Sequence, residues 1–139
     1  MHVLLSIKPR FVKEIKSGNK KFEFRKSLVS RKNWNKIEKV FIYSSSPVKR
    51  IVARFFIKQI LEDHPRILWE NCKDFSGIEK TEFFQYFGGR EKGVAIEFSG
   101  VKFYTRPIDP KEVFSKFVAP QSFCYIEDIE GFKKIPSFL

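Results

Sequence analysis

A lysine, a glutamate and an arginine stand close together near the start of the chain, at Lys20, Glu23 and Arg25. A carboxylate beside a lysine that is partly removed from water could activate a water molecule or serve as acid and base. The same groups could instead bind a ligand, with the cations on phosphate and the carboxylate on the edge of a base. They could also neutralise one another in an ion pair. These residue types leave catalysis, binding and a structural role open.

The residues around this triplet predict an extended strand from about 20 to 25. Gly18 and Asn19 favour a turn before it, because both residues tolerate positive φ. Aromatic residues at 22 and 24 then alternate with charged residues at 21, 23 and 25. Since successive side chains of a strand point to opposite faces, same-face groups lie about 7 Å apart. We therefore expect one buried aromatic face and one solvent-exposed charged face.

This stretch resembles the signature of the ASCH domain family, a part of the PUA-like superfamily of small β-barrels. That signature has roughly the form Gly-x-Lys-x-x-Glu-x-Arg, and four residues fill it at matching spacing: Gly18, Lys20, Glu23 and Arg25. The similarity continues along most of the chain, at 5–9, 43–49, 77–80, 83–87, 93–96 and 121–123. The resemblance implies one ASCH (PUA-like) domain over residues 1–139. Its fold would be α+β and mainly β, a mixed β-barrel with a few short peripheral helices.

The pattern of the remaining chain agrees with such a fold. Apolar runs and alternation predict strands at 3–7, 40–43, 51–61 and 94–104, the last of them bending at Gly100. Helices are predicted from Pro9 to Gly18, from 65 to 72 with Asp63 as its cap, and after a capping box made by Ser76 and Glu79. Because strands dominate, a mixed barrel is favoured over a doubly wound sheet.

The charge of the chain points to a polyanionic partner. Its 27 Lys and Arg against 16 Asp and Glu give a net charge of +11 and a pI near 9.7. Such an excess attracts nucleic acid, with an anionic membrane surface as the weaker alternative. A protein can also be basic without using the charge. No apolar run approaches the length of a membrane span, so we expect no membrane association.

Two further segments could contact a nucleic acid. The basic loop at 26–37 contains Trp34, which could stack on bases or instead plug one end of the barrel. Ser44 and Ser45 follow a strand, where hydroxyl and backbone N–H groups could hold a phosphate, although serines also simply form turns. We expect cations on phosphate, Glu23 on a base edge, and Tyr43 or Trp34 stacked on a base. The candidate binding residues are Lys8, Lys20, Glu23, Arg25, Trp34, Tyr43, Ser44, Ser45 and Lys49.

Several common chemistries have no signature in the chain. It contains no glycine-rich phosphate loop and no dinucleotide fingerprint. His2 and His64 lack the spacing of metal ligands, so we expect neither a metal nor another cofactor. Cys72 and Cys124 are expected to be free thiols of a cytoplasmic protein, since the start of the chain has no signal-peptide pattern. Nothing in the sequence indicates an oligomeric state.

Three functions follow from these observations. The favoured one is a module that binds RNA or a nucleotide, with single-stranded nucleic acid preferred; the preference for RNA over DNA comes from the resemblance. The alternative is a hydrolase with Lys20 and Glu23 as catalytic residues. Some small ASCH proteins remove an acetyl group from N4-acetylcytidine with a lysine, a threonine and a glutamate, and others have been reported as ribonucleases. Lys20 matches that lysine, whereas Glu23 stands where the pattern has threonine. The third is a protein-interaction or coregulator domain.

The position of Glu23 separates these functions. A structural role predicts that Glu23 is paired with Arg25 or Lys20, without an open cleft. Binding and catalysis both predict that Lys20 and Glu23 meet at an accessible pocket next to Ser44 and Ser45.

Overall fold

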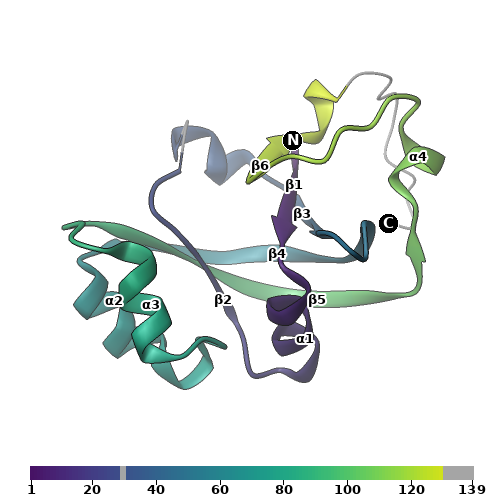
Figure 1. Ribbon diagram of the computed structural model, residues 1–139. Coiled ribbons are helices and arrows are strands. Elements are labelled where there is room, and N and C mark those ends of the chain that lie inside the picture. Colours follow the sequence, from purple (N-terminus) through teal and green to yellow (C-terminus); the bar gives the residue numbers. More distant parts are fainter. Residues whose placement is uncertain (29–30, 130–139) are drawn as a thin grey trace. The chain divides into compact units, whose positions relative to one another are not determined.

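The structure, a computed structural model, describes residues 1–28 and 31–129 of the chain. Its strands are β1 (His2–Ile7), β2 (Phe22–Arg25), β3 (Lys39–Ser44), β4 (Arg50–Asp63), β5 (Gly93–Ile108) and β6 (Phe123–Tyr125). Its α-helices are α1 (Pro9–Ser17), α2 (Pro65–Cys72), α3 (Lys80–Phe87) and α4 (Pro110–Val113). Short 3-10 helices follow the same order: η1 (Arg31–Lys36), η2 (Lys73–Phe75) and η3 (Ile126–Asp128). Figure 1 shows these elements along the chain.

The six strands form one hydrogen-bonded sheet in the order β2-β5-β4-β3-β1-β6. The sheet is mixed, because β1 pairs with β3 in parallel, whereas β1 with β6, β2 with β5 and β3 with β4 are antiparallel. A mixed sheet with a few short helices confirms the predicted fold class, α+β and mainly β. No helix in the described part of the chain is long and apolar enough to cross a membrane.

The chain divides into two compact units, which are described separately below. The first unit comprises Met1–Pro9, Asn35–Phe56 and Gly100–Leu139, and the second comprises Arg10–Trp34 and Ile57–Ser99. The first therefore contains β1, β3 and β6, and the second contains β2, α2 and α3. The predicted signature residues belong to the second unit, and the predicted serine turn belongs to the first.

The core of the first unit lies against the parallel β1–β3 pair. The register of this pair runs from His2 opposite Lys39 to Ile7 opposite Ser44, so both strands end at the same edge. Apolar side chains of β1 and β3 pack against apolar side chains of β4 and of the chain after β5. This buried cluster consists of Leu4, Phe41, Tyr43, Ile51, Phe114 and Ile126.

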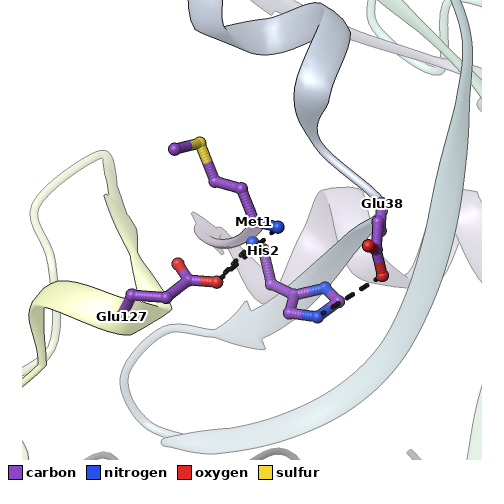
Figure 2. A network of polar contacts seen from close by, with 4 residues as sticks. All are labelled: Met1, His2, Glu38 and Glu127. Atoms are coloured by element: carbon purple, nitrogen blue, oxygen red, sulfur yellow. Dashed lines mark hydrogen bonds and ion pairs between the residues drawn. The ribbon is translucent and has the colours of Figure 1, made fainter.

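A polar network holds the beginning of β1, as Figure 2 shows. The backbone N–H of His2 donates to Glu127 Oε1 at 2.9 Å, and the Met1 nitrogen lies 3.9 Å from the same oxygen. On the other side, His2 Nε2 lies 3.8 Å from Glu38 Oε2. Burial and the nearby Met1 amine lower the pKa of His2, against the opposing effect of the two carboxylates. These contacts fix the strand whose far end carries candidate site residues.

The core of the second unit is aromatic. The phenylalanine face of β2 is buried as predicted, and the Phe24 ring lies 4.9 Å from the Phe83 ring of α3. Helices α2 and α3 lie side by side over this cluster (Figure 1). Its buried members are Phe22, Phe24, Leu68, Cys72, Phe83, Phe87 and Ala95.

The N-terminal caps of α2 and α3 differ from the prediction. The span of α2 was predicted correctly, but its N-cap is His64, whose Nδ1 accepts from Arg66 N at 3.1 Å, and not Asp63. The predicted capping box at Ser76 is wrong, because α3 begins at Lys80 with Glu79 as its N-cap. Ser76 Oγ instead lies within hydrogen-bond distance of backbone carbonyl oxygens, 3.3 Å from Lys73 and 3.1 Å from Ile78.

Candidate nucleic-acid interface

Lys20 lies in the interior of the second unit. It is only 3% exposed, and its Nζ donates to the carbonyl oxygen of Ser76 at 2.9 Å. The ammonium group also lies 4.8 Å from the centre of the Phe24 ring and 5.1 Å from that of Phe11, within the range of a cation–π contact. Burial lowers the pKa of Lys20 to about 8, although the nearby Glu23 carboxylate acts in the opposite direction.

Glu23 and Arg25 neutralise each other within β2. Arg25 Nη2 donates to Glu23 Oε2 at 2.7 Å, and the two side chains are only 13% and 10% exposed. The predicted solvent-exposed charged face is therefore wrong at Glu23, because this residue is buried. The ion pair makes this burial possible, because two opposite charges in contact offset each other's desolvation. This arrangement is the one expected if the signature residues have a structural role.

Gly77 covers the side chain of Lys20. A Cβ at Gly77 would lie 2.4 Å from Lys20 Cβ and 2.7 Å from its Cγ, and the residue has a φ of +63°. Lys20 also forms an isolated antiparallel bridge with Ser76. Only a glycine allows this close approach at positive φ, so the segment acts as a lid on the lysine. Sequence reasoning missed this contact, because the glycine was taken as part of a capping box.

An acidic cavity lies beside this lid. It has a volume of about 460 Å³, and Ser76 and Gly77 line it, whereas Lys20 does not. Two cations line it, with Arg10 Nη1 donating to Glu82 Oε2 at 2.9 Å. The carboxylates are more numerous: Glu14, Asp74, Glu79 and Glu82. Such a charge balance disfavours phosphate at this cavity.

Trp34 is not available for stacking in this structure. Its side chain is 1% exposed, which places it among the largest fully buried side chains. A base cannot reach either face of a buried indole ring. The burial of Trp34 therefore contradicts the first of its two predicted roles, stacking on a base. The second role, a plug at one end of the barrel, stays a prediction.

Five candidate residues converge in the first unit, where β1 and β3 end. Ser45 N donates to the carbonyl oxygen of Ile7 at 3.0 Å, which joins the turn after β3 to the end of β1. Within this turn, Val48 N donates a hydrogen bond to the carbonyl oxygen of Ser45 at 3.1 Å. Because β1 and β3 are parallel, their last residues lie at the same edge of the sheet, and so do the residues next to these strand ends. They are Lys8, Tyr43, Ser44, Ser45 and Lys49, and we call this region the β1–β3 edge.

Exposed cations border the β1–β3 edge. Lys8 and Lys49 are exposed, and Lys49 has a φ of +54° that few residues other than glycine adopt. Arg50 Nη1 donates to the carbonyl oxygen of Lys49 at 2.9 Å, and its Nη2 lies 3.9 Å from Asp109 Oδ2. Among the charged groups named here, three are cations and one is a carboxylate, so their net charge is positive.

Just inside the edge lie three hydroxyl-bearing residues, one on β1, one on β3 and one directly before β6. Ser6 lies opposite Tyr43 of β3, and Ser6 N donates to the carbonyl oxygen of Ser122 at 2.9 Å next to β6. Residues opposite each other on paired strands share one face. The Tyr43 ring is 4% exposed and lies 5.4 Å from the Phe117 ring, so the predicted stacking of Tyr43 on a base is wrong. The Ser6 hydroxyl donates to the carbonyl oxygen of Pro120 at 2.6 Å. Sequence reasoning assigned no role to Ser6 or Ser122, although both stand in stretches that resemble the family.

The structure thus separates the candidate residues into two groups. Lys20, Glu23 and Arg25 lie together in the second unit, where protein groups satisfy them. The β1–β3 edge of the first unit presents two exposed lysines, Lys8 and Lys49, and the half-buried Ser45. The predicted contact of a ligand with Ser44 is wrong in this structure, because Ser44 is only 2% exposed. In the described ranges, 1–28 and 31–129, no group of three or more His, Cys, Asp or Glu side chains could hold a metal ion.

Comparison with known proteins identifies relatives of the whole chain. A family model described as "Domain of unknown function (DUF365)" matches residues 2–119. An ASCH domain-containing ribonuclease from Zymomonas mobilis is 27% identical over 142 residues, which cover 95% of this chain and 88% of that protein. The crystal structure of ASCH from Zymomonas mobilis has a TM-score of 0.76 at 26% identity, covering 91% of this chain and 88% of the other. A serine-to-alanine variant of that protein gives a TM-score of 0.77 at 26% identity, covering 91% and 89%.

Proposed function

Because this chain belongs to the DUF365 family and has the ASCH fold, we propose that it binds single-stranded RNA at the β1–β3 edge of its first unit. A relative of nearly full length is named a ribonuclease, which supports a function on RNA. The single observation that carries the proposal is the convergence of Lys8, Ser45 and Lys49 where two parallel strands end. Cations and hydroxyls at one edge are the groups that contact a phosphate backbone.

The signature residues support this proposal less well than the edge does. Lys20 and Glu23 are 3% and 8% exposed, and each already has a partner within the protein. A phosphate that approached Lys20 would first have to displace Gly77 and the Ser76 carbonyl oxygen. Lys8 and Lys49 are exposed and require no such rearrangement. We therefore assign RNA contact to the edge and a supporting role to the signature strand.

Removing the two exposed cations of the edge is expected to weaken RNA binding. For Lys8→Gln/Lys49→Gln we expect roughly tenfold lower affinity at low salt, and a slope of log affinity against log salt that is smaller by about 1.4, because two phosphate contacts are lost. Fluorescence anisotropy of labelled single-stranded RNA across a salt series measures both quantities.

A matched control separates this site from the overall charge. Lys13→Gln/Lys92→Gln removes two exposed lysines of the second unit and lowers the net charge by the same amount. It is expected to bind RNA nearly as wild type does. Equal losses for the two double variants would contradict an RNA site at the edge and leave only non-specific attraction. Ser45→Ala adds a test of the half-buried hydroxyl at the edge, with a loss of about three- to tenfold expected for one hydrogen bond.

Cleavage of RNA is the second candidate function, and the name of the relative favours it. The lowered pKa of Lys20, about 8, makes its amine the strongest candidate for proton transfer in the described part of the second unit. Glu23 is the neighbouring carboxylate. If Lys20 acts in cleavage, Lys20→Met should retain RNA binding and lose degradation of end-labelled RNA on a gel. A Lys20→Met protein that degrades RNA at the wild-type rate would remove Lys20 from any catalytic role.

A further inference from the structure

We propose that a groove between α2 and α3 in the second unit stacks a base of single-stranded RNA, as a contact additional to the β1–β3 edge. This inference depends on the proposed RNA-binding function and assigns a second contact surface to it. The groove has a volume of about 660 Å³, within the range of small-ligand pockets. It is lined by Arg66, Ile67, Trp69, Glu70, Lys80 and Phe84, and we call it the α2–α3 groove.

The wall of the groove is aromatic and remains accessible. The Trp69 and Phe84 rings are half-buried, with centroids 6.1 Å apart at an interplanar angle of 57°. Trp69 is supported from inside by Phe83, which is fully buried and whose ring lies 5.0 Å away. Ile67 extends the apolar surface and is 46% exposed. A rigid, partly exposed indole is a platform on which any base can stack.

The rim of the groove carries positive charge that its own carboxylate does not neutralise. Glu70 Oε2 accepts from Lys73 Nζ at 3.0 Å, so this acid is already paired outside the groove wall. Arg66 and Lys80 are exposed, and neither forms an ion pair with a residue in the described ranges. Lys80 is the first residue of α3. The rim therefore presents two cations that the carboxylate of the groove does not neutralise.

This combination selects an occupant with a flat ring and a negative charge. A nucleotide satisfies both requirements, with its base on Trp69 and its phosphate near Arg66 and Lys80. An apolar peptide would cover the ring but leave both cations without a partner. The acidic cavity beside Gly77 has the opposite charge balance and does not meet these requirements. Trp34, one of two aromatic residues considered for stacking, is buried, whereas Trp69 is half-buried.

The test compares the affinity of variants for a fluorescein-labelled octamer of uridylate. Trp69→Leu removes the stacking ring but keeps an apolar side chain, and we expect about tenfold weaker binding with an unchanged salt slope. Arg66→Gln/Lys80→Gln should instead reduce the salt slope by about 1.4. Lys13→Gln/Lys92→Gln again controls for the loss of two charges. Circular dichroism and thermal unfolding establish that each variant is folded.

Intrinsic fluorescence gives a second, independent measurement. Stacking of a base on Trp69 should quench the wild-type tryptophan emission as uridylate is added. Trp69→Phe should bind with at most about threefold lower affinity and lose that quenching, because the remaining tryptophan, Trp34, is buried. Because this conservative variant keeps an aromatic ring against Phe83, we expect it to fold like wild type.

The outcomes distinguish the groove from the proposed function. If wild type binds RNA but Trp69→Leu and Arg66→Gln/Lys80→Gln bind like wild type, the groove has no part in binding and the edge proposal stands. If Lys8→Gln/Lys49→Gln matches its control while the groove variants lose affinity, the edge proposal falls and the groove remains. Absence of RNA binding by wild type would overturn both.

Discussion

Gly77→Ala is expected to lower the free energy of unfolding by about 2–4 kcal/mol, from strain at a left-handed backbone position together with overpacking. The new methyl group would lie 2.4 Å from Lys20 Cβ, a distance that real Cβ atoms do not reach. Since that neighbouring atom belongs to the base of a side chain, rotation of the lysine cannot relieve the contact. Backbone movement of the 76–78 segment is then required, and urea denaturation measures its free-energy cost.

Gly18→Ala is the matched control for this prediction. Gly18 also has a positive φ, +87°, but a Cβ there would meet no atom within 4 Å. Its substitution reports the backbone strain alone, about 1 kcal/mol. Lys20→Ala should not rescue Gly77→Ala, because alanine keeps the Cβ that causes the contact. Equal losses of unfolding free energy for Gly18→Ala and Gly77→Ala would show that the 76–78 segment moves away from Lys20 at no free-energy cost.

The sequence predicted elements well where the local pattern determines them. The span of α2, Pro65–Cys72, agrees with the helix predicted from about 65 to 72, although the predicted cap, Asp63, is wrong. The long strands β4 and β5 follow from extended apolar alternation. The ASCH resemblance, carried by a motif of four residues and by further similarity along most of the chain, identified the fold that the structure and the relatives share.

Burial of polar side chains could not be predicted in the same way. Alternation along β2 places Glu23 opposite the phenylalanines, but it does not tell whether that face is covered. The Arg25–Glu23 ion pair, which permits burial, depends on rotamers chosen in the folded state. Trp34 likewise stands in a basic, polar loop, yet its ring is buried. Local composition indicates which residues can contact water, and tertiary packing decides which of them do.

The candidate site shows the same division. Ser45 and Lys49 were recognised from the sequence, because a turn after a buried strand brings such groups toward the surface, whereas Ser44 at the end of that strand is buried. The parallel pairing that adds Lys8 and Ser6 to this edge connects residues 37 positions apart, as in Ser6 with Tyr43. Strand partners at such a distance leave no local signal. Ser122 lies in a third segment, directly before β6, and its place beside Ser6 likewise left no local signal in the sequence.

Lys20 is expected to make stability depend on pH in the alkaline range. Its pKa is lowered by burial from 10.5 to about 8 in the folded protein. Between these two pH values the unfolded chain binds the proton and the folded chain does not, so the free energy of unfolding rises with pH. Charged Lys20 therefore destabilises the fold below pH 8, and this effect disappears as the pH rises toward 10.5. A pKa difference of this size corresponds to about 3 kcal/mol.

Urea denaturation of wild type and Lys20→Met between pH 7 and 10.5 tests this expectation. The stability of wild type relative to Lys20→Met should increase by about 3 kcal/mol across the range, because methionine cannot titrate and the other ionisable groups are common to both proteins. Glu23→Gln supplies the second arm. Its carboxylate raises the pKa of Lys20, so its removal should lower that pKa further and start the rise in stability at a lower pH. Parallel pH profiles for wild type and Lys20→Met would show that the lysine keeps an ordinary pKa in the folded protein, and that its amine gains no capacity for proton transfer near neutral pH.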